Sequence, residues 1–98
     1  MSNAVLVHGD TVYVVDPVDT PDGSTRKMLC KGTVNTVDYH SWGKHVWVEW
    51  QDPKREPSIR MMITLSKDPR QAIESRTDLS ADEIQEITVD AKARGLLN

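Results

Sequence analysis

The sequence predicts a small, strongly bent β-barrel of four or five strands, followed by one or two helices at the C-terminus. Two segments, Gly9–Val14 and Lys44–Trp50, alternate apolar and polar residues with the period of two that is typical of strands. A third such segment contains Gly32, and a glycine inside a strand commonly marks a bulge or a sharp bend. The fold class is therefore mainly β with C-terminal α.

The strands are expected in four segments and the turns between them. A short lead-in strand is expected over residues 4–8, before the barrel, and Gly9-Asp10 forms the first turn. The four strands are predicted over residues 11–15, 26–38, 44–51 and 58–65. They are joined by a long loop over 16–25, a hairpin connection over 39–43 and a charged turn over 52–57.

One face of the strand over 44–51 is expected to point into the core. Val46, Val48 and Trp50 share that face, whereas His45 and Trp47 share the other. The chain contains no Phe, so its three tryptophans and two tyrosines supply all of its large aromatic surface. Trp50 and one other tryptophan are therefore expected to fill the barrel, unless the aromatic group serves a binding surface instead.

The hydrophobic period changes in the last third of the chain. Asp68-Pro69 begins a short helix that runs to about residue 75. Ser80–Glu83 forms a capping box for a second helix over 81–94, and Gly95 ends it. Ile84 and Ile87 are expected to dock this helix on the barrel, either as a lid over one barrel end or as a face that binds a partner. Residues 1–67 and 68–98 are thus barrel and helical extension of a single domain.

Charge and cysteine content narrow the class of protein. The net charge is −3, and the excess lies in residues 68–98, which hold seven acidic and four basic residues. A general nucleic-acid binder usually has a basic domain, which this chain lacks. The single cysteine, Cys30, excludes an internal disulfide and suits a reducing compartment. With no long apolar run and no secretory signal pattern, a cytoplasmic location without membrane contact is expected.

The strand pattern resembles a known group of small barrels. Gly9-Asp10-x-Val12-x-Val14, Gly32-x-Val34-x-x-Val37 and Val46-x-Val48-x-Trp50 are similar to SH3-like barrels, most of all to the KOW and Tudor types of transcription, translation and chromatin proteins. The resemblance covers residues 9–66 and implies a binding platform. The predicted loop 16–25 is longer, more acidic and richer in proline than the first loop of the KOW type, and the C-terminal helices lie outside the pattern.

Aromatic and basic residues give the candidate binding surface. Trp42 lies beside Gly43 at the tip of the predicted hairpin, where an exposed tryptophan would anchor a protein partner. The residues expected to bind a protein partner are Trp42, His40, Lys44, His45, Trp47, Lys54 and Arg55. The alternative is a nucleic-acid site in which Trp42 stacks on bases and four basic residues bind phosphates: Lys44, Lys54, Arg55 and Arg60.

The sequence contains no catalytic or cofactor-binding motif that we recognise. His8, Cys30, His40 and His45 are scattered over three segments, without the close pairs that a zinc site uses. A nucleophile and base formed by Cys30 and His40 is the one enzymatic arrangement that the residue types allow. We therefore expect a non-enzymatic interaction module that uses no metal or cofactor.

Overall fold

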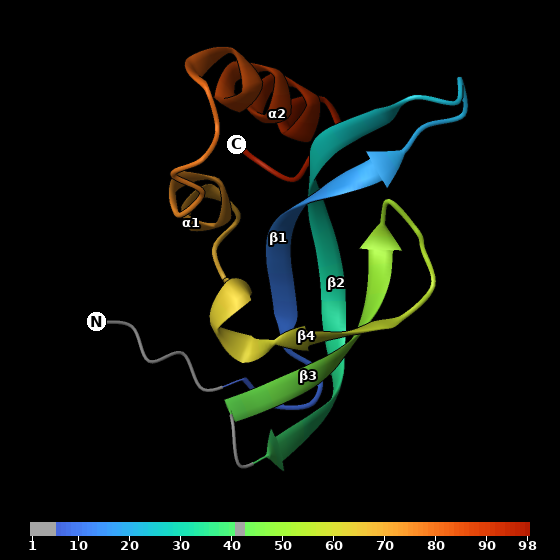
Figure 1. The fold of residues 1–98 in the computed structure, drawn as a ribbon, viewed down its shortest axis with the longest axis vertical. Helices are drawn as coiled ribbons and strands as arrows, with labels where there is room; N and C mark the ends of the chain where they lie inside the picture. Colours follow the sequence, from blue (N-terminus) through green and yellow to red (C-terminus); the bar gives the residue numbers. More distant parts are fainter. Residues whose placement is uncertain (1–5, 41–42) are drawn as a thin grey trace.

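The computed structural model describes residues 6–40 and 43–98, with residues 39, 40 and 43 described by their backbone alone. Four antiparallel strands follow one another in the order β1-β2-β3-β4: β1 (Thr11–Asp19), β2 (Thr25–His40), β3 (Gly43–Asp52) and β4 (Ser58–Met61). A 3-10 turn, η1 (Met62–Thr64), and two helices, α1 (Pro69–Glu74) and α2 (Ala81–Ala93), complete the chain. The strands curl into a half-barrel (Figure 1), which confirms the mainly β class with C-terminal helices.

The bend of β2 confirms the expectation for Gly32. The pairing of β2 with β3 shifts register between Lys31 and Gly32, and again between Val34 and Thr36. A Cβ on Gly32 would lie 2.6 Å from Val48 Cγ1 and 2.9 Å from Trp50 Cε3. Only glycine therefore lets these two core side chains of β3 pack directly against the β2 backbone.

The first loop is much shorter than predicted, because β1 continues through Asp19 and leaves only residues 20–24 as the turn. Pro17 suggested a loop, but its backbone faces the outer edge of the sheet. Alternate residues of a strand direct their backbone N–H and C=O groups to the same edge, so Pro17 shares its edge with Tyr13 and Val15. At that edge Tyr13 exchanges backbone hydrogen bonds with Ser66, and Val15 O accepts a hydrogen bond from Arg76 Nη1. At an edge facing away from β2, the missing N–H of a proline interrupts no pairing between strands.

Two other predicted strands differ from the structure. Residues 6–8 form no strand; Leu6 instead packs in the core with 2% of its surface exposed, and residues 4 and 5 lie outside the described part. The predicted strand over 58–65 ends at Met61, where η1 turns the chain back toward β1. Ser66 then forms an isolated bridge with Tyr13, so the half-barrel is closed here by one pair of residues.

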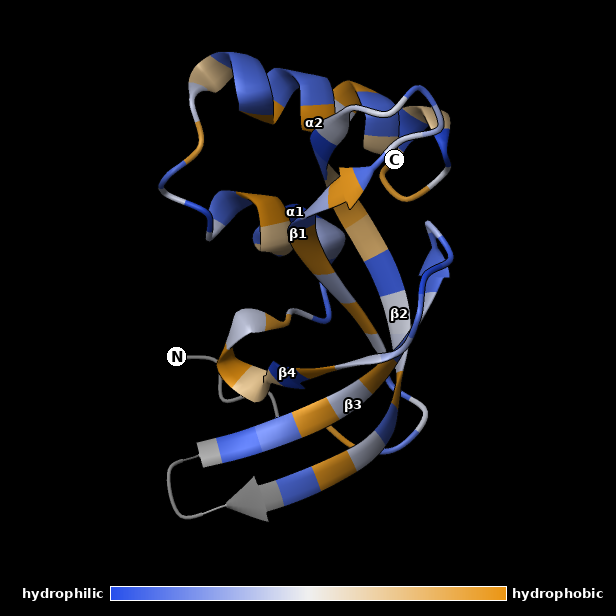
Figure 2. Cartoon of the chain, turned by 45° about the vertical axis from the view of Figure 1, so that its right-hand side comes forward, coloured by the Kyte–Doolittle hydropathy of each residue, from blue (hydrophilic) through white to orange (hydrophobic). Residues whose placement is uncertain are grey.

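The sheet has a separate apolar cluster on each face. The concave side holds Val14, Cys30, Val46, Val48 and Trp50 among other buried residues, as the alternation in β3 predicts. The opposite face of β1 and β2 presents Val15 and Leu29 to the two helices (Figure 2). The helices therefore cover the outside of the sheet and do not close an end of the half-barrel.

The second helix begins as predicted and ends one residue early. Ser80 and Glu83 form the capping box, and Gly95 follows the helix with a φ of +80°. Ile87 is buried as expected, but Ile84 keeps 37% of its surface exposed, so its predicted docking is wrong. The position one turn before Ile87 on the barrel side is Glu83, whose carboxylate binds Lys27 Nζ of β2 at 3.0 Å.

We expect Gly32→Ala to lower the free energy of unfolding by about 1–3 kcal/mol, because the added methyl group must displace Val48 and Trp50. Urea denaturation followed by far-UV circular dichroism measures the change. Thr36→Ala, at an exposed position of the same strand, is the matched control and should change stability by about 0.5 kcal/mol or less. Equal stability of the two variants would contradict the close packing at Gly32.

The two isoleucines of α2 give a second test. Ile87→Ala should cost about 2–4 kcal/mol of stability, because it leaves a cavity between α2 and the sheet. Ile84→Ala removes the same atoms from a partly exposed position and should cost less than about 1 kcal/mol. The same denaturation measurement compares them, and a larger loss for Ile84→Ala would mean that α2 presents a different face to the sheet.

Candidate interaction surface

An exposed apolar patch lies on the convex face of β3 and β4. Trp47 is directly opposite Ile59 in the pairing of these strands, and Met61 is opposite His45. Side chains alternate between the faces of a strand, so burial of Val46 and Val48 places Trp47 on the outside. Trp47, Ile59 and Met61 keep 37%, 57% and 43% of their surface exposed. We call these three residues the convex patch.

The convex patch is not covered by the helices. The outer apolar cluster under α1 and α2 contains sheet residues from β1 and β2 alone. Ile63, in η1 just after β4, is exposed over 86% of its surface and adds to the apolar character of this region. Apolar patches that extend over a few hundred Å² of a monomer are often functional, whereas single exposed side chains are ordinary. This face is therefore the strongest candidate for contact with another molecule.

A charged cluster fills the concave side next to the turn over 52–57. Asp16 of β1 is buried, and its carboxylate binds Arg60 Nη2 at 2.6 Å and Arg55 Nη2 at 3.2 Å. Both guanidinium groups also lie over the ring of Trp50, at 4.6 Å for Arg55 and 5.1 Å for Arg60. Trp50 Nε1 donates to Ser58 Oγ at 2.9 Å. One carboxylate thus ties β1 to the turn, to β4 and to the core tryptophan of β3.

The electrostatics of Asp16 follow from this geometry. Burial raises the pKa of the Asp16 carboxyl, but the hydrogen bonds and charges of Arg60 and then of Arg55 outweigh it, so the pKa lies below its ordinary value of 3.8. Asp16 is therefore ionised at neutral pH. The cluster as a whole carries one net positive charge, since two guanidinium groups face one carboxylate.

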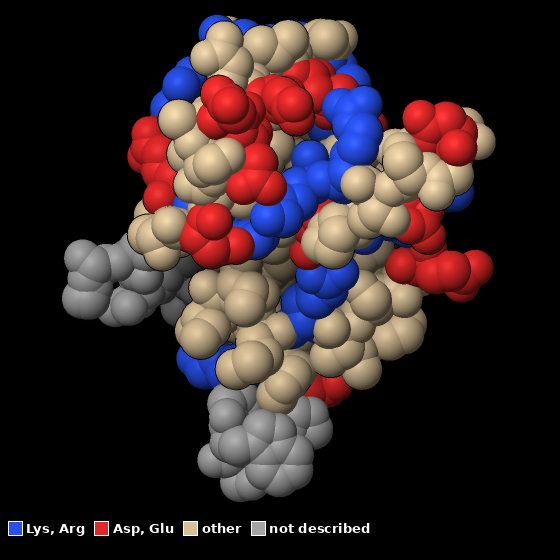
Figure 3. Space-filling view, turned by 45° about the horizontal axis from the view of Figure 1, so that its top comes forward, with Lys and Arg blue, Asp and Glu red and all other residues tan. Residues whose placement is uncertain are grey.

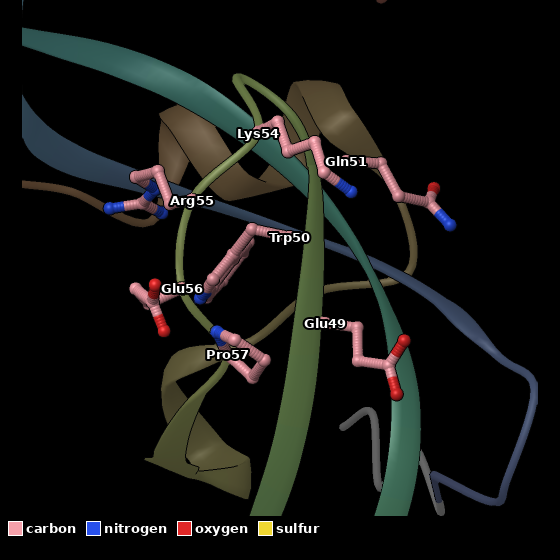
Figure 4. A pocket seen from close by; sticks show the side chains of 7 residues that line it. All are labelled: Glu49, Trp50, Gln51, Lys54, Arg55, Glu56 and Pro57. Atoms are coloured by element: carbon pink, nitrogen blue, oxygen red, sulfur yellow. The ribbon is translucent and has the colours of Figure 1, made fainter.

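A shallow hollow of about 670 Å³ lies on the outer side of this cluster. Figure 4 shows Trp50 pointing from β3 into the space enclosed by the turn, with Arg55 on the far side of the ring. Lys54 and Gln51 lie at one rim of the hollow, and an isolated bridge joins their backbones. Glu49 and Glu56 also line it, so the hollow has carboxylates as well as cations at its wall.

The structure separates the residues predicted for one surface into two groups. Lys44 and His45 lie at the beginning of the ten-residue strand β3, whereas Lys54 and Arg55 follow its end. Trp47 lies between them on the convex face. Trp42 is outside the described residues, as is the side chain of His40. Of the four cations proposed for phosphate binding, Arg55 and Arg60 are directed to Asp16, whereas Lys44 and Lys54 are exposed.

Sequence reasoning misses four residues of this region: Ile59, Met61, Ile63 and Asp16. The prediction places Ile59 and Met61 in a strand but does not assign them to a surface. It misses Ile63 because the predicted strand over 58–65 extends through η1. The signal for Ile59 and Met61 is the alternation of side chains along the strand. An outward Trp47 requires an outward residue opposite it on the next strand, which is Ile59, and Met61 lies two residues further on. Asp16 is missed because the predicted loop over 16–25 removes it from β1.

Cys30 lies in the apolar cluster on the concave side of the sheet. Cys30 is buried, and burial raises the pKa of its thiol to about 11, so it is protonated at neutral pH. Among residues 6–40 and 43–98, no group of three His, Cys, Asp or Glu side chains is arranged to hold a metal ion.

Comparison with protein families, with curated proteins and with solved structures finds no match to this chain. Within the part of the chain that the structure describes, no helix is long and apolar enough to cross a membrane.

Replacing Asp16 by Asn should destabilise the fold by about 2 kcal/mol at neutral pH. The full cost of breaking a buried ion pair is about 3–5 kcal/mol, but about a quarter of each arginine side chain is open to water, which reduces it. Urea denaturation at pH 7 measures the loss, and a stability equal to that of the wild type would contradict the role of Asp16.

The same variant has a defined pH dependence. Because the folded-state pKa of Asp16 lies below 3.8, its ionised form stabilises the fold above that pH and the contribution is lost as the pH falls through the folded-state pKa. The difference in unfolding free energy between wild type and Asp16→Asn should therefore shrink between about pH 5 and pH 2. The comparison cancels the contributions of other carboxyl groups, and a difference that stays constant with pH would exclude charge as the cause.

Proposed function

We propose that this protein is a non-enzymatic interaction module, a small accessory or regulatory protein that docks on a larger protein or nucleoprotein assembly. The observation that carries the proposal is the convex patch, in which Trp47 stands beside Ile59 and Met61 on a face that the helices leave uncovered. Tryptophan is enriched among the residues that dominate binding energy at protein interfaces. Its large ring anchors a contact while its N–H group reaches a polar rim.

The surroundings of the convex patch suggest the chemistry of the partner. Lys44 is exposed at one end of β3, and Glu49 lies on the outer face beyond Trp47. An apolar centre with polar residues at its border is the usual composition of a transient protein interface. The partner is therefore a protein surface with an apolar pocket for the indole of Trp47 and both signs of charge around it.

The arrangement after β4 supports the finer assignment to SH3-like barrels of the KOW or Tudor type. A strongly bent meander of four strands leads into η1, and the chain then returns to β1 at the Tyr13–Ser66 bridge. In a five-stranded barrel this return would be the fifth strand. The helices after Lys67 add a second apolar cluster with β1 and β2, which supports a single domain made of barrel and extension.

A nucleic-acid-binding function of KOW type is the alternative, and one observation favours it. Lys54 is exposed at the hollow beside the Trp50–Arg55 stack, where a phosphate could approach. The charges elsewhere give it less support. Lys and Arg form a row across one face with acidic side chains along it (Figure 3), and Lys27, Arg76 and Arg94 each bind a carboxylate at 3.0 Å or less.

A cytoplasmic location fits the proposed role. Cys30 is a buried free thiol, which a reducing compartment preserves.

Trp47→Ala should weaken binding of the protein partner by about 2 kcal/mol, roughly 30-fold, because it removes the anchor of the interface. The measurement is capture of partners from native lysate by the purified protein, with and without nuclease, with mass spectrometry as readout. Trp42→Ala tests the predicted hairpin anchor in the same way. Partners that persist after nuclease and are lost with Trp47→Ala support the proposal.

The matched control is Val89→Ala, which removes another exposed apolar side chain, but one that lies on α2. Circular dichroism of each variant checks that the fold is intact. Partners that disappear with nuclease, together with affinity that falls steeply with salt, would support the nucleic-acid alternative instead. Equal capture by Trp47→Ala and wild type would exclude the convex patch as the docking surface.

A further inference from the structure

The last strand of the sheet has one side without a partner strand. β3 pairs along one side of β4, and no strand within residues 6–40 and 43–98 pairs along the other. The chain leaves β4 at Met61, whose carbonyl accepts from Thr64 Oγ1, and its next backbone pairing is the Ser66–Tyr13 bridge on β1. An open strand edge of this kind presents N–H and C=O groups to any other strand that can reach it.

The edge of β4 lacks the charges that usually prevent such pairing. Proteins commonly place Lys or other charged side chains on exposed edges so that strands of different molecules repel one another. Arg60 is the single charged residue of β4, and its guanidinium is drawn to Asp16, with Nη1 and Nη2 at 3.0 and 2.6 Å. The outward residues are Ile59 and Met61, which are apolar. Pro57, just before the strand, limits the available edge to Ser58–Met61.

We infer that β4 pairs antiparallel with β4 of a second copy of this chain, about a two-fold axis. Side chains opposite each other must point to the same face, so Ile59 lies opposite either Ile59 or Met61 of the second copy. The register with Met61 would place the two Arg60 side chains opposite each other, which is unfavourable for like charges. The register that remains has Ile59 on the axis and Ser58 opposite Arg60.

The extent of the contact fits a weak dimer. Standard stable interfaces bury about 800 Å² per partner, and pairing of Ser58–Arg60 with the exposed surface of Ile59, Met61 and Ile63 covers on the order of half of that or less. We therefore expect a dissociation constant on the order of 10 µM or weaker. The symmetry is closed, because both copies use the same strand, so pairing stops at two chains.

Pairing at β4 would enlarge the docking surface described above. The convex patches of the two copies lie on the same face of one continuous sheet, with Trp47 of each copy one strand from the axis. The partner would then contact one continuous apolar surface that has a Trp47 on each side of the two-fold axis. This consequence depends on the proposed function, whereas the pairing of the two chains depends only on the edge of β4.

Sedimentation equilibrium of the whole protein from about 1 µM to about 1 mM tests the pairing, since this range brackets the expected dissociation constant. The average mass should rise toward that of two chains. Ile59→Lys places a charge on the axis and should weaken association at least tenfold. Val89→Lys is the matched control, with a similar exposed fraction on α2, and should associate like the wild type. Trp47→Ala should still dimerise while losing the partner, which separates the two proposals.

Cross-linking tests the register and does not require a charged substitution to fold. Ile59→Cys should give disulfide-linked dimers under mild oxidation, because residues on the axis have their Cβ atoms about 5 Å apart. Val89→Cys should give at least tenfold fewer, and the buried Cys30 is the same in both. A single-chain mass up to the highest concentration, equal effects of the two lysine variants, or equal cross-linking of the two cysteine variants would each overturn the inference.

Discussion

The contact between Asp16 and two arginines over Trp50 holds together four separate segments of the chain. The carboxylate comes from β1, one guanidinium from the turn over 52–57, the other from β4 and the ring from β3. β1 and β4 are the two ends of the sheet, so this contact spans the open side of the half-barrel. It also holds two of the chain's cations on the concave side, away from the convex patch.

The curvature of β2 is the second constraint on the structure. With two register shifts and Gly32 against Val48 and Trp50, the strand bends far enough for β1 and β4 to approach each other. The bend gives the sheet a concave face, filled by valines and Trp50, and a convex face. On β1 and β2 the helices cover the convex face, and on β3 and β4 they do not. The candidate interaction surface is therefore the part of the convex face, on β3 and β4, that the helices leave uncovered.

Much of this fold could be predicted because its signals are local. Alternation placed Val46, Val48 and Trp50 in the core, Gly32 marked the bend, and Ser80–Glu83 with Gly95 fixed the ends of α2. The errors came from residues whose conformation depends on distant partners. Pro17 predicts a loop, because the sequence does not show that Ser66 and Arg76 bind the edge of β1 on which its backbone lies. Arg55 and Arg60 are predicted as free cations, because the sequence does not place Asp16 beside them. Ile63 is predicted in a strand, whereas in the structure η1 exposes it to solvent.

The two apolar clusters share neighbouring residues of β1, and this has a consequence for how the chain folds. Val14 belongs to the concave cluster and Val15 to the cluster under the helices. Ordering β1 in one cluster therefore also fixes the residues that it contributes to the other. The second cluster also depends on contacts between segments far apart along the chain: Arg76 Nη1 donates to Val15 O, and Arg94 Nη2 donates to Leu29 O. Closing loops of some sixty residues is slow compared with forming a hairpin. Half-barrel and helices should therefore gain their final order in one cooperative step, set by the arrival of α2 on β1 and β2.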